Sequence, residues 1–183
     1  AVLNAISNGS LDVKPLITER IPLLEYDKIY GDMGASKSIA SILEYDSTEV
    51  PESTVTLHDK SFEGKKGVIG IVGAGNFTSA TILPNLKKLN SAIKYIASSG
   101  GLSSTTMAKQ YKIANSTTDY HEILKDDDVD LILVTTQHHM HAEMAIQAIN
   151  ANKSVFIEKP LALNQKELDQ IIEAYNINNV NIT

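Results

Sequence analysis

The sequence of 183 residues contains no cysteine, no tryptophan and one arginine, Arg20. Without cysteine the chain forms no disulfide, no thiol nucleophile and no cysteine-ligated metal site. A single arginine leaves almost no means of bidentate phosphate or carboxylate binding. No apolar run reaches the roughly 18 residues of a membrane-spanning helix, and no basic start followed by an apolar core marks a secretory signal. We therefore expect a cytoplasmic protein with no membrane partner.

Positive charge is scarce and unevenly placed. The formal net charge of −6 argues against a sequence-blind nucleic-acid binder, which needs clustered cations for phosphates. Residues 1–60 carry ten acids and five bases, and residues 61–183 carry twelve acids and eleven bases. Between these parts, residues 46–66 are polar, contain Pro51 and lack a helical period. We predict an N-terminal appendage (1–50), a linker (51–66) and a main domain (67–183).

The main domain alternates short apolar runs with segments of helical periodicity. The expected strands are 68–72, 93–97, 131–135 and 154–157, with an extended piece at 117–119 and a further strand starting at 180–183. The expected helices are 77–89, bent at Pro84, then 104–111, 120–124, 141–151 and 167–175, the last opened by the capping pair Asn164 and Glu167. This alternation predicts an α/β fold, a doubly wound parallel sheet with right-handed crossovers.

The segment GAGNFT (73–78) stands between the first strand and the first helix, where a dinucleotide fingerprint belongs. Gly73 permits a tight turn, and Gly75 has no Cβ to keep a pyrophosphate from the backbone. Free N–H groups and the helix dipole then stabilise the anion. Thr78 takes the third glycine position and is expected to loosen helix–strand packing slightly. The motif favours nucleotide binding over a merely structural turn.

The end of the second strand lacks the acidic residue that commonly binds the adenosine ribose. The sequence there is SSGG (98–101), with no arginine for a 2′-phosphate. In one interpretation, Ser98 and Ser99 bind ribose or phosphate, which leaves the choice between NAD and NADP open with a slight tilt towards NADP. In the other, they only begin a turn and cap the next helix.

Polar residues also follow the strand at 131–135, in the segment TTQHHMH (135–141). Ligands of open α/β sheets lie at the carboxyl ends of the strands, so these residues are placed to contact a nicotinamide ribose or a substrate. A plain helix N-terminus with solvated histidines is the alternative. His138 and His141 have metal-ligand spacing, but no third ligand accompanies them, and we expect no metal site.

Glu158, Lys159 and Pro160 follow the last predicted strand of the alternating pattern. A lysine held by a neighbouring glutamate and aimed into the cleft can polarise a carbonyl, or exchange a proton with a hydroxyl during hydride transfer. By spacing alone, a turn with a surface ion pair is the favoured interpretation.

Taken together, GAGNFT, TTQHHMH and EKPLAL (158–163) make residues 67–183 resemble the nucleotide-binding domain of the Gfo/Idh/MocA oxidoreductases. These enzymes use NAD or NADP, and many act on sugars, cyclitols or sugar-nucleotides; EKP is the most specific element of the resemblance. It implies pyrophosphate contacts at Gly73, Gly75, Asn76, Phe77 and Thr78, and adenosine ribose contacts at Ser98 and Ser99. It further implies contacts with the other half of the cofactor at Thr136, Gln137 and His141, and nicotinamide contacts at Glu158, Lys159 and Pro160. Lys159 would be the catalytic lysine and Pro160 would bring a strained or cis bond, whereas His138 stands where the family often has asparagine.

Residues 1–50 carry a second resemblance, through DVKPLITER (12–20), Pro22, Leu23, Tyr30 and SILEY (41–45). They resemble the C-terminal tail of a medium-chain, zinc-type alcohol dehydrogenase. This implies an excerpt of a bi-domain oxidoreductase, inactive without its substrate domain. The tail would expose apolar faces, from which we expect a homo-oligomer.

The favoured hypothesis is the cofactor half of an NAD(P)-dependent oxidoreductase that transfers hydride to or from a sugar-like alcohol or ketone. A non-catalytic dinucleotide-binding module is the alternative. A methyltransferase using S-adenosylmethionine fits less well, since it calls for an acid after the second strand and has no use for the EKP segment.

Overall fold

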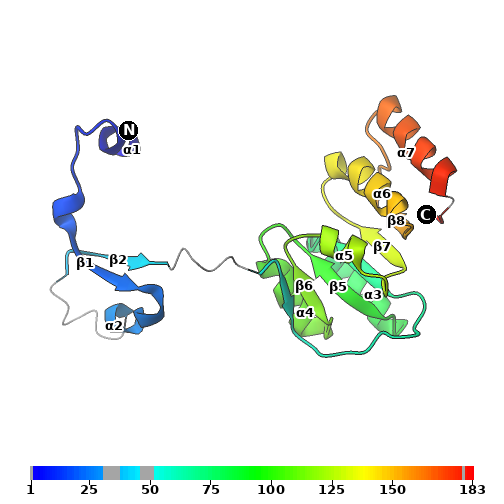
Figure 1. The fold of residues 1–183 in the computed structure, drawn as a ribbon, viewed down its shortest axis with the longest axis horizontal. Coiled ribbons are helices and arrows are strands. Elements are labelled where there is room, and N and C mark those ends of the chain that lie inside the picture. Colours follow the sequence, from blue (N-terminus) through cyan, green and yellow to red (C-terminus); the bar gives the residue numbers. More distant parts are fainter. Residues whose placement is uncertain (1, 31–37, 46–51, 179) are drawn as a thin grey trace. The chain divides into compact units, whose positions relative to one another are not determined.

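The computed structural model describes residues 2–30, 38–45, 52–178 and 180–183, and the chain divides into two compact units, Ala1–Pro51 and Glu52–Thr183 (Figure 1). No helix in the described part of the chain is long and apolar enough to cross a membrane.

The first unit is built around two strands. Its elements are α1 (Val2–Ser7), η1 (Lys14–Leu16), β1 (Ile17–Pro22), η2 (Leu23–Glu25), α2 (Asp27–Tyr30) and β2 (Ala40–Glu44). Strands β1 and β2 pair in parallel as a two-stranded sheet. Among the described residues of this unit, Ile21 alone is buried, while Leu16, Leu24 and Ile39 are exposed. So small a buried surface gives the unit little hydrophobic stabilisation of its own.

The second unit contains a six-stranded sheet in the order β3-β6-β5-β4-β7-β8. Its strands are β3 (Thr54–Thr56), β4 (Ile69–Val72), β5 (Ile93–Ala97), β6 (Asn115–Thr117), β7 (Leu131–Val134) and β8 (Ser154–Ile157). The five strands from β4 to β8 are parallel, and β3 runs antiparallel along the β6 edge. Because the chain winds outward from β4 in both directions, the predicted doubly wound α/β fold is confirmed.

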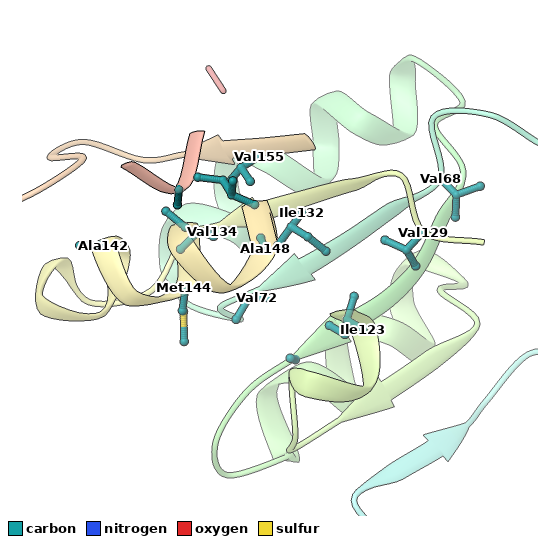
Figure 2. Packing of buried hydrophobic residues seen from close by; sticks show 14 of the residues in the cluster. Val68, Val72, Ile123, Val129, Ile132, Val134, Ala142, Met144, Ala148 and Val155 are labelled. Atoms are coloured by element: carbon teal, nitrogen blue, oxygen red, sulfur yellow. The ribbon is translucent and has the colours of Figure 1, made fainter. Parts of the chain in front are cut away.

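Helices cover both faces of this sheet (Figure 1). They are η3 (Thr78–Ile82) with α3 (Leu83–Lys88), then α4 (Leu102–Tyr111), α5 (His121–Lys125), η4 (His138–Met140), α6 (His141–Asn150) and α7 (Gln165–Asn178). On one face, Ile132, Val134 and Val155 of the sheet pack in one cluster with Ala148 of α6 (Figure 2). On the other face, Ile71, Ile96 and Leu133 pack with residues of α3 and α4. The central strands β4 and β7 are largely buried from both sides, which explains their continuous apolar runs.

The predicted linker at 51–66 is wrong in part. Thr54–Thr56 forms strand β3, and the hydroxyl of Thr54 donates to that of Thr117 at 2.8 Å. Phe62 is buried in the core of the same unit. The strand escapes detection because it is three residues long, polar, and held by a partner about 60 residues away. Residues 46–51 of the expected polar stretch lie outside the described residues.

The helical segment continues through Pro84, in agreement with the sequence prediction that this proline does not end it. The chain makes a π-helical turn, η3, in which the N–H of Leu83 donates to the carbonyl of Thr78. The ordinary α-helical bonding resumes in α3. A wider turn accommodates the proline, which has no N–H to donate.

The predicted capping pair and the last predicted strand are both present. The side chain of Asn164 accepts the N–H of Glu167 at 3.0 Å, and the carboxylate of Glu167 accepts the N–H of Leu163 at 2.7 Å. Ile182 forms a parallel bridge with Val155, so a further strand begins beside β8.

Candidate functional site

The polar motifs of the sequence meet at the carboxyl edge of the sheet. Val72 is in register with Ala97 on one side and with Val134 on the other, and Val134 is in register with Ile157. The residues that follow these strand ends are Gly73, Ser98, Thr135 and Glu158. The strand order reverses at β4, and a crevice at such a switch point is where open α/β sheets bind ligands.

The two glycines after β4 have different tasks. Gly73 has a φ of 115°, and a Cβ on it would lie 2.7 Å from the carbonyl carbon and oxygen of Thr135. Only glycine fits there. A Cβ on Gly75, by contrast, would meet no atom within 4 Å. Gly75 therefore faces open space, where a ligand can approach the backbone.

The helix that follows the glycines begins with exposed side chains at Asn76 and Phe77. Its first N–H groups have no partner within the helix, and they lie beside the open space at Gly75. An anion in that space can therefore accept hydrogen bonds from the backbone.

Thr78 is fully buried, and its hydroxyl donates to the carbonyl of Gly73 at 2.7 Å. It also lies 2.7 Å from the hydroxyl of Thr135, which in turn donates to the Gly73 carbonyl at 3.0 Å. The expected loosening at the third glycine position is therefore replaced by a tie between the glycine turn and the end of β7. Thr78 can offer a ligand only its backbone. The sequence places Thr135 in the polar segment after β7, but its hydroxyl bonds to the Gly73 carbonyl.

The two serines after β5 differ in their availability. The hydroxyl of Ser98 donates to that of buried Ser104 at 2.8 Å and accepts its N–H at 3.3 Å. Ser98 thus holds the start of α4, in agreement with the capping interpretation. Ser99 is exposed at the edge of the site. Only Ser99 of this pair has a side chain open to a ligand.

The loop after β7 carries three predicted contact residues in unlike surroundings. Gln137 is exposed, and the hydroxyl of Thr136 donates weakly to the sulfur of Met144 at 3.5 Å. His141 has no exposed surface. Its Nδ1 lies 2.9 Å from the carbonyl oxygen of Pro160, and its Nε2 lies 3.1 Å from that of Thr136. With both ring nitrogens engaged by the backbone, His141 does not offer the predicted polar contact to a cofactor.

The turn after β8 holds Lys159 at the same edge. Glu158 donates its N–H to the carbonyl of Val134 at 3.0 Å, and its carboxylate accepts the N–H of Lys159 at 3.1 Å. The bond between Lys159 and Pro160 is cis, and the side chain of Lys159 is exposed. In the described part of the chain no ion pair joins Glu158 to Lys159, so the expected pairing is replaced by a carboxylate–backbone bond. No cluster of three metal-ligating side chains occurs among the described residues.

The strongest charge pairing lies at the opposite, amino edge of the sheet. The ammonium of Lys94 lies 2.7 Å from the carboxylates of both Asp126 and Asp128, and the hydroxyl of Tyr95 donates to Asp126 at 2.8 Å. Burial opposes the charge on Asp126, but bonds from Lys94 and Tyr95 outweigh it and lower the pKa of its carboxyl. Burial and the bond to Asp126 raise the pKa of Tyr95.

A match to a known protein family identifies the family of the main domain. The model of the Gfo/Idh/MocA family, described as an oxidoreductase family with an NAD-binding Rossmann fold, matches residues 68–183. The chain belongs to this family. The predicted resemblance of the main domain is thereby confirmed, and NAD binding is a property of the family; the alcohol dehydrogenase-like tail has no such support.

Two curated relatives are about one third identical to this chain over the aligned residues. Inositol 2-dehydrogenase of Salmonella typhimurium is 35% identical over 108 residues, which are 57% of this chain and 32% of the relative. Myo-inositol 2-dehydrogenase of Thermotoga maritima is 34% identical over 106 residues, or 57% and 31% of the two chains. The chain spans about a third of the length of these relatives.

Solved structures with a similar fold cover 62–63% of this chain. A probable dehydrogenase from Thermotoga maritima gives a TM-score of 0.58 at 28% identity, covering 63% of this chain and 34% of that chain. Levoglucosan dehydrogenase in complex with NADH and levoglucosan gives 0.56 at 27% identity, over 63% and 34%. KijD10, a 3-ketoreductase from Actinomadura kijaniata in complex with NADP and TDP-benzene, gives 0.57 at 23% identity over 62% and 35%, and shows the fold alone.

Proposed function

We propose that residues 67–183 bind NAD or NADP and take part in hydride transfer to or from a sugar-like alcohol or ketone, such as a sugar, cyclitol or sugar-nucleotide. The observation that carries this proposal is the convergence of the open Gly75 turn and the exposed Lys159 on one edge of the sheet. The relatives named as inositol and levoglucosan dehydrogenases support the substrate class.

The glycine turn fits the pyrophosphate of a dinucleotide. The open space at Gly75 admits the anion to the backbone, and the N–H groups of Asn76, Phe77 and Thr78 at the helix start can donate to it. Exposed Ser99 is then the side chain available to the adenosine ribose. Thr136, Gln137 and Glu158 are proposed to contact the other half of the cofactor.

Lys159 is proposed to exchange a proton with the oxygen on the substrate carbon that gains or loses the hydride. When bound, the dinucleotide accepts or donates the hydride. The ammonium of Lys159 gives its proton to the carbonyl oxygen in the direction of reduction, and the uncharged amine accepts the hydroxyl proton in the direction of oxidation. The bond from its N–H to the Glu158 carboxylate fixes the backbone from which this side chain extends.

Residues 1–50 are proposed to derive from the tail of a medium-chain dehydrogenase. Three large apolar side chains of this unit, on Leu16, Leu24 and Ile39, are 51%, 92% and 70% exposed. Such surface favours burial against another chain, and we propose that copies of the protein associate through it. Sedimentation of a monodisperse monomer would contradict this association.

Cofactor binding is tested by calorimetric titration of the chain with NADH and, separately, with NADPH. The chain has no tryptophan, so energy transfer from indole is not an available signal. Saturable binding is expected for both. Because no carboxylate follows β5 to repel a 2′-phosphate, NADPH is expected to bind at least as tightly as NADH. Absence of binding of either cofactor at millimolar concentration would contradict the proposed function.

A further inference from the structure

We infer that His141 is a positioning residue, which ties the turn carrying Lys159 to the loop after β7. The inference deepens the proposed function and rests on it for the role of Lys159. His141 is the first residue of α6, and its ring lies between the carbonyl oxygens of Pro160 and Thr136, at 2.9 Å and 3.1 Å. One buried ring thus joins two loops at the carboxyl edge of the sheet.

Both contacts are to carbonyl oxygens, which only accept hydrogen bonds. A ring nitrogen that carries a proton therefore donates to the carbonyl it faces, and the neutral ring has one such N–H. The ring has no exposed surface, and water cannot replace a lost bond there. Substituting His141 therefore leaves one or both carbonyls without a partner, unless the loops move apart.

The contact between the His141 ring and the carbonyl of Pro160 lies one residue after Lys159 in the chain. The turn after β8 is held at its start by the Glu158 N–H, bonded to Val134, and at its end by the Leu163 N–H, bonded to Glu167. His141 holds its middle, at the carbonyl of Pro160. Loss of this contact frees the peptide group between Pro160 and Leu161, one residue beyond Lys159, while both ends of the turn remain fixed.

Two other roles for His141 make different predictions. A direct cofactor contact needs a free ring nitrogen, and simple packing needs only the volume of the ring. His138 and His139 offer a contrast on the same loop, because both are exposed. His139 is therefore the matched control for a histidine that is near in sequence but outside the tie.

The test uses amide NMR spectra of the uniformly ¹⁵N-labelled chain without ligand. His141→Leu removes both donors, and His141→Gln keeps one amide donor group. We expect the signals of Lys159, Leu161 and Gln137 to shift or broaden strongly in His141→Leu and less in His141→Gln. His139→Gln is expected to leave these signals in place. Ile149→Ala, a cavity variant further along the same buried helix, is expected to lower the melting temperature without moving them.

A cofactor titration of the same variants separates the alternatives. The NADPH affinity of His141→Gln is expected to stay within about threefold of the parent chain, because the ring contacts protein alone. A loss of tenfold or more would overturn the inference in favour of direct contact. Unmoved signals of Lys159 and Leu161 in His141→Leu would overturn it in favour of packing. If the parent chain binds neither NADH nor NADPH, the proposed function fails, while the spectra still decide whether His141 ties the two loops.

Discussion

Polar side chains are paired with one another at the amino edge of the six-stranded sheet, whereas some at the carboxyl edge are left open. At the amino edge, Lys94, Tyr95, Asp126 and Asp128 satisfy one another through short contacts. At the carboxyl edge, the ammonium of Lys159 has no hydrogen-bond or ion-pair partner among the described residues, and a Cβ on Gly75 would meet no atom.

The comparison shows that charge by itself does not mark a functional site. The amino edge holds the denser charge, yet its groups are paired, which is what buried charges need for stability. At the carboxyl edge, Ser98 bonds to Ser104 at the start of α4, while Thr78 and His141 bond to backbone carbonyls of the loops. The groups left over there are the ones available to a ligand.

The largest expected effect is on turnover at the carboxyl edge. In a polypeptide that carries this domain and turns over, Lys159→Ala is expected to lower kcat by about 10²–10⁴-fold, the usual contribution of general acid–base catalysis. Cofactor affinity measured by calorimetry should change little. Lys166→Ala, an exposed lysine on α7, serves as the control. Unchanged turnover in Lys159→Ala would remove this lysine from the mechanism.

Substitutions at the two glycines after β4 are expected to have different effects, one on the stability of the fold and the other on cofactor binding. Gly73→Ala is expected to destabilise the fold by about 3 kcal/mol, since it combines a φ of 115° with a clash against the Thr135 backbone. Gly75→Ala is expected to change stability by less than about 0.5 kcal/mol, because its Cβ meets open space. Its methyl group would occupy the pyrophosphate site and weaken NADPH binding about tenfold or more. Thermal unfolding and calorimetry measure the two effects. Unaltered NADPH affinity in Gly75→Ala would place the pyrophosphate elsewhere.

The sequence predicts well those parallel strands that are continuous apolar runs, whereas the polar strand β6 lies at Asn115–Thr117 and not at the expected 117–119. Strands β5 and β8 have the predicted bounds, 93–97 and 154–157, since a continuous apolar run leaves few alternatives. Strand β3 has no such run: Thr54–Thr56 is held by hydrogen bonds to a distant edge, which no local pattern reports.

The sequence predicts which motifs lie at the candidate site, but it does not predict what each side chain of those motifs contacts. Sequence position brings Ser98, Ser99 and His141 to the correct edge, because they follow strand ends in a parallel sheet. Whether a hydroxyl or a ring faces a ligand depends on which buried partner it meets. Ser98 meets Ser104, and His141 meets two carbonyls, neither of which sequence spacing can show.

The smallest expected effect on NADPH binding concerns the amino edge, where a substitution should alter stability and leave the affinity unchanged. Asp126→Asn is expected to lower the free energy of unfolding at neutral pH by about 2 kcal/mol, between the values for exposed and buried ion pairs. Its carboxylate is largely buried and bonds to Lys94, Tyr95 and the N–H of Asp128. Asp127→Asn, at the exposed neighbouring residue, is the matched control.

The pH dependence of this effect follows from the direction of the Asp126 pKa shift. Folding lowers the pKa of this carboxyl, so its stabilisation is complete above the ordinary aspartate pKa and is lost as pH falls through the folded-state value. The gap between the parent chain and Asp126→Asn in urea unfolding should therefore narrow in acid. Lys94 behaves in the opposite way: attraction to Asp126 and Asp128 exceeds the effect of its burial and raises its pKa, so its contribution is lost only in alkali. A fall in NADPH affinity in Asp126→Asn, without unfolding, would contradict the assignment of stability to the amino edge and of cofactor binding to the carboxyl edge.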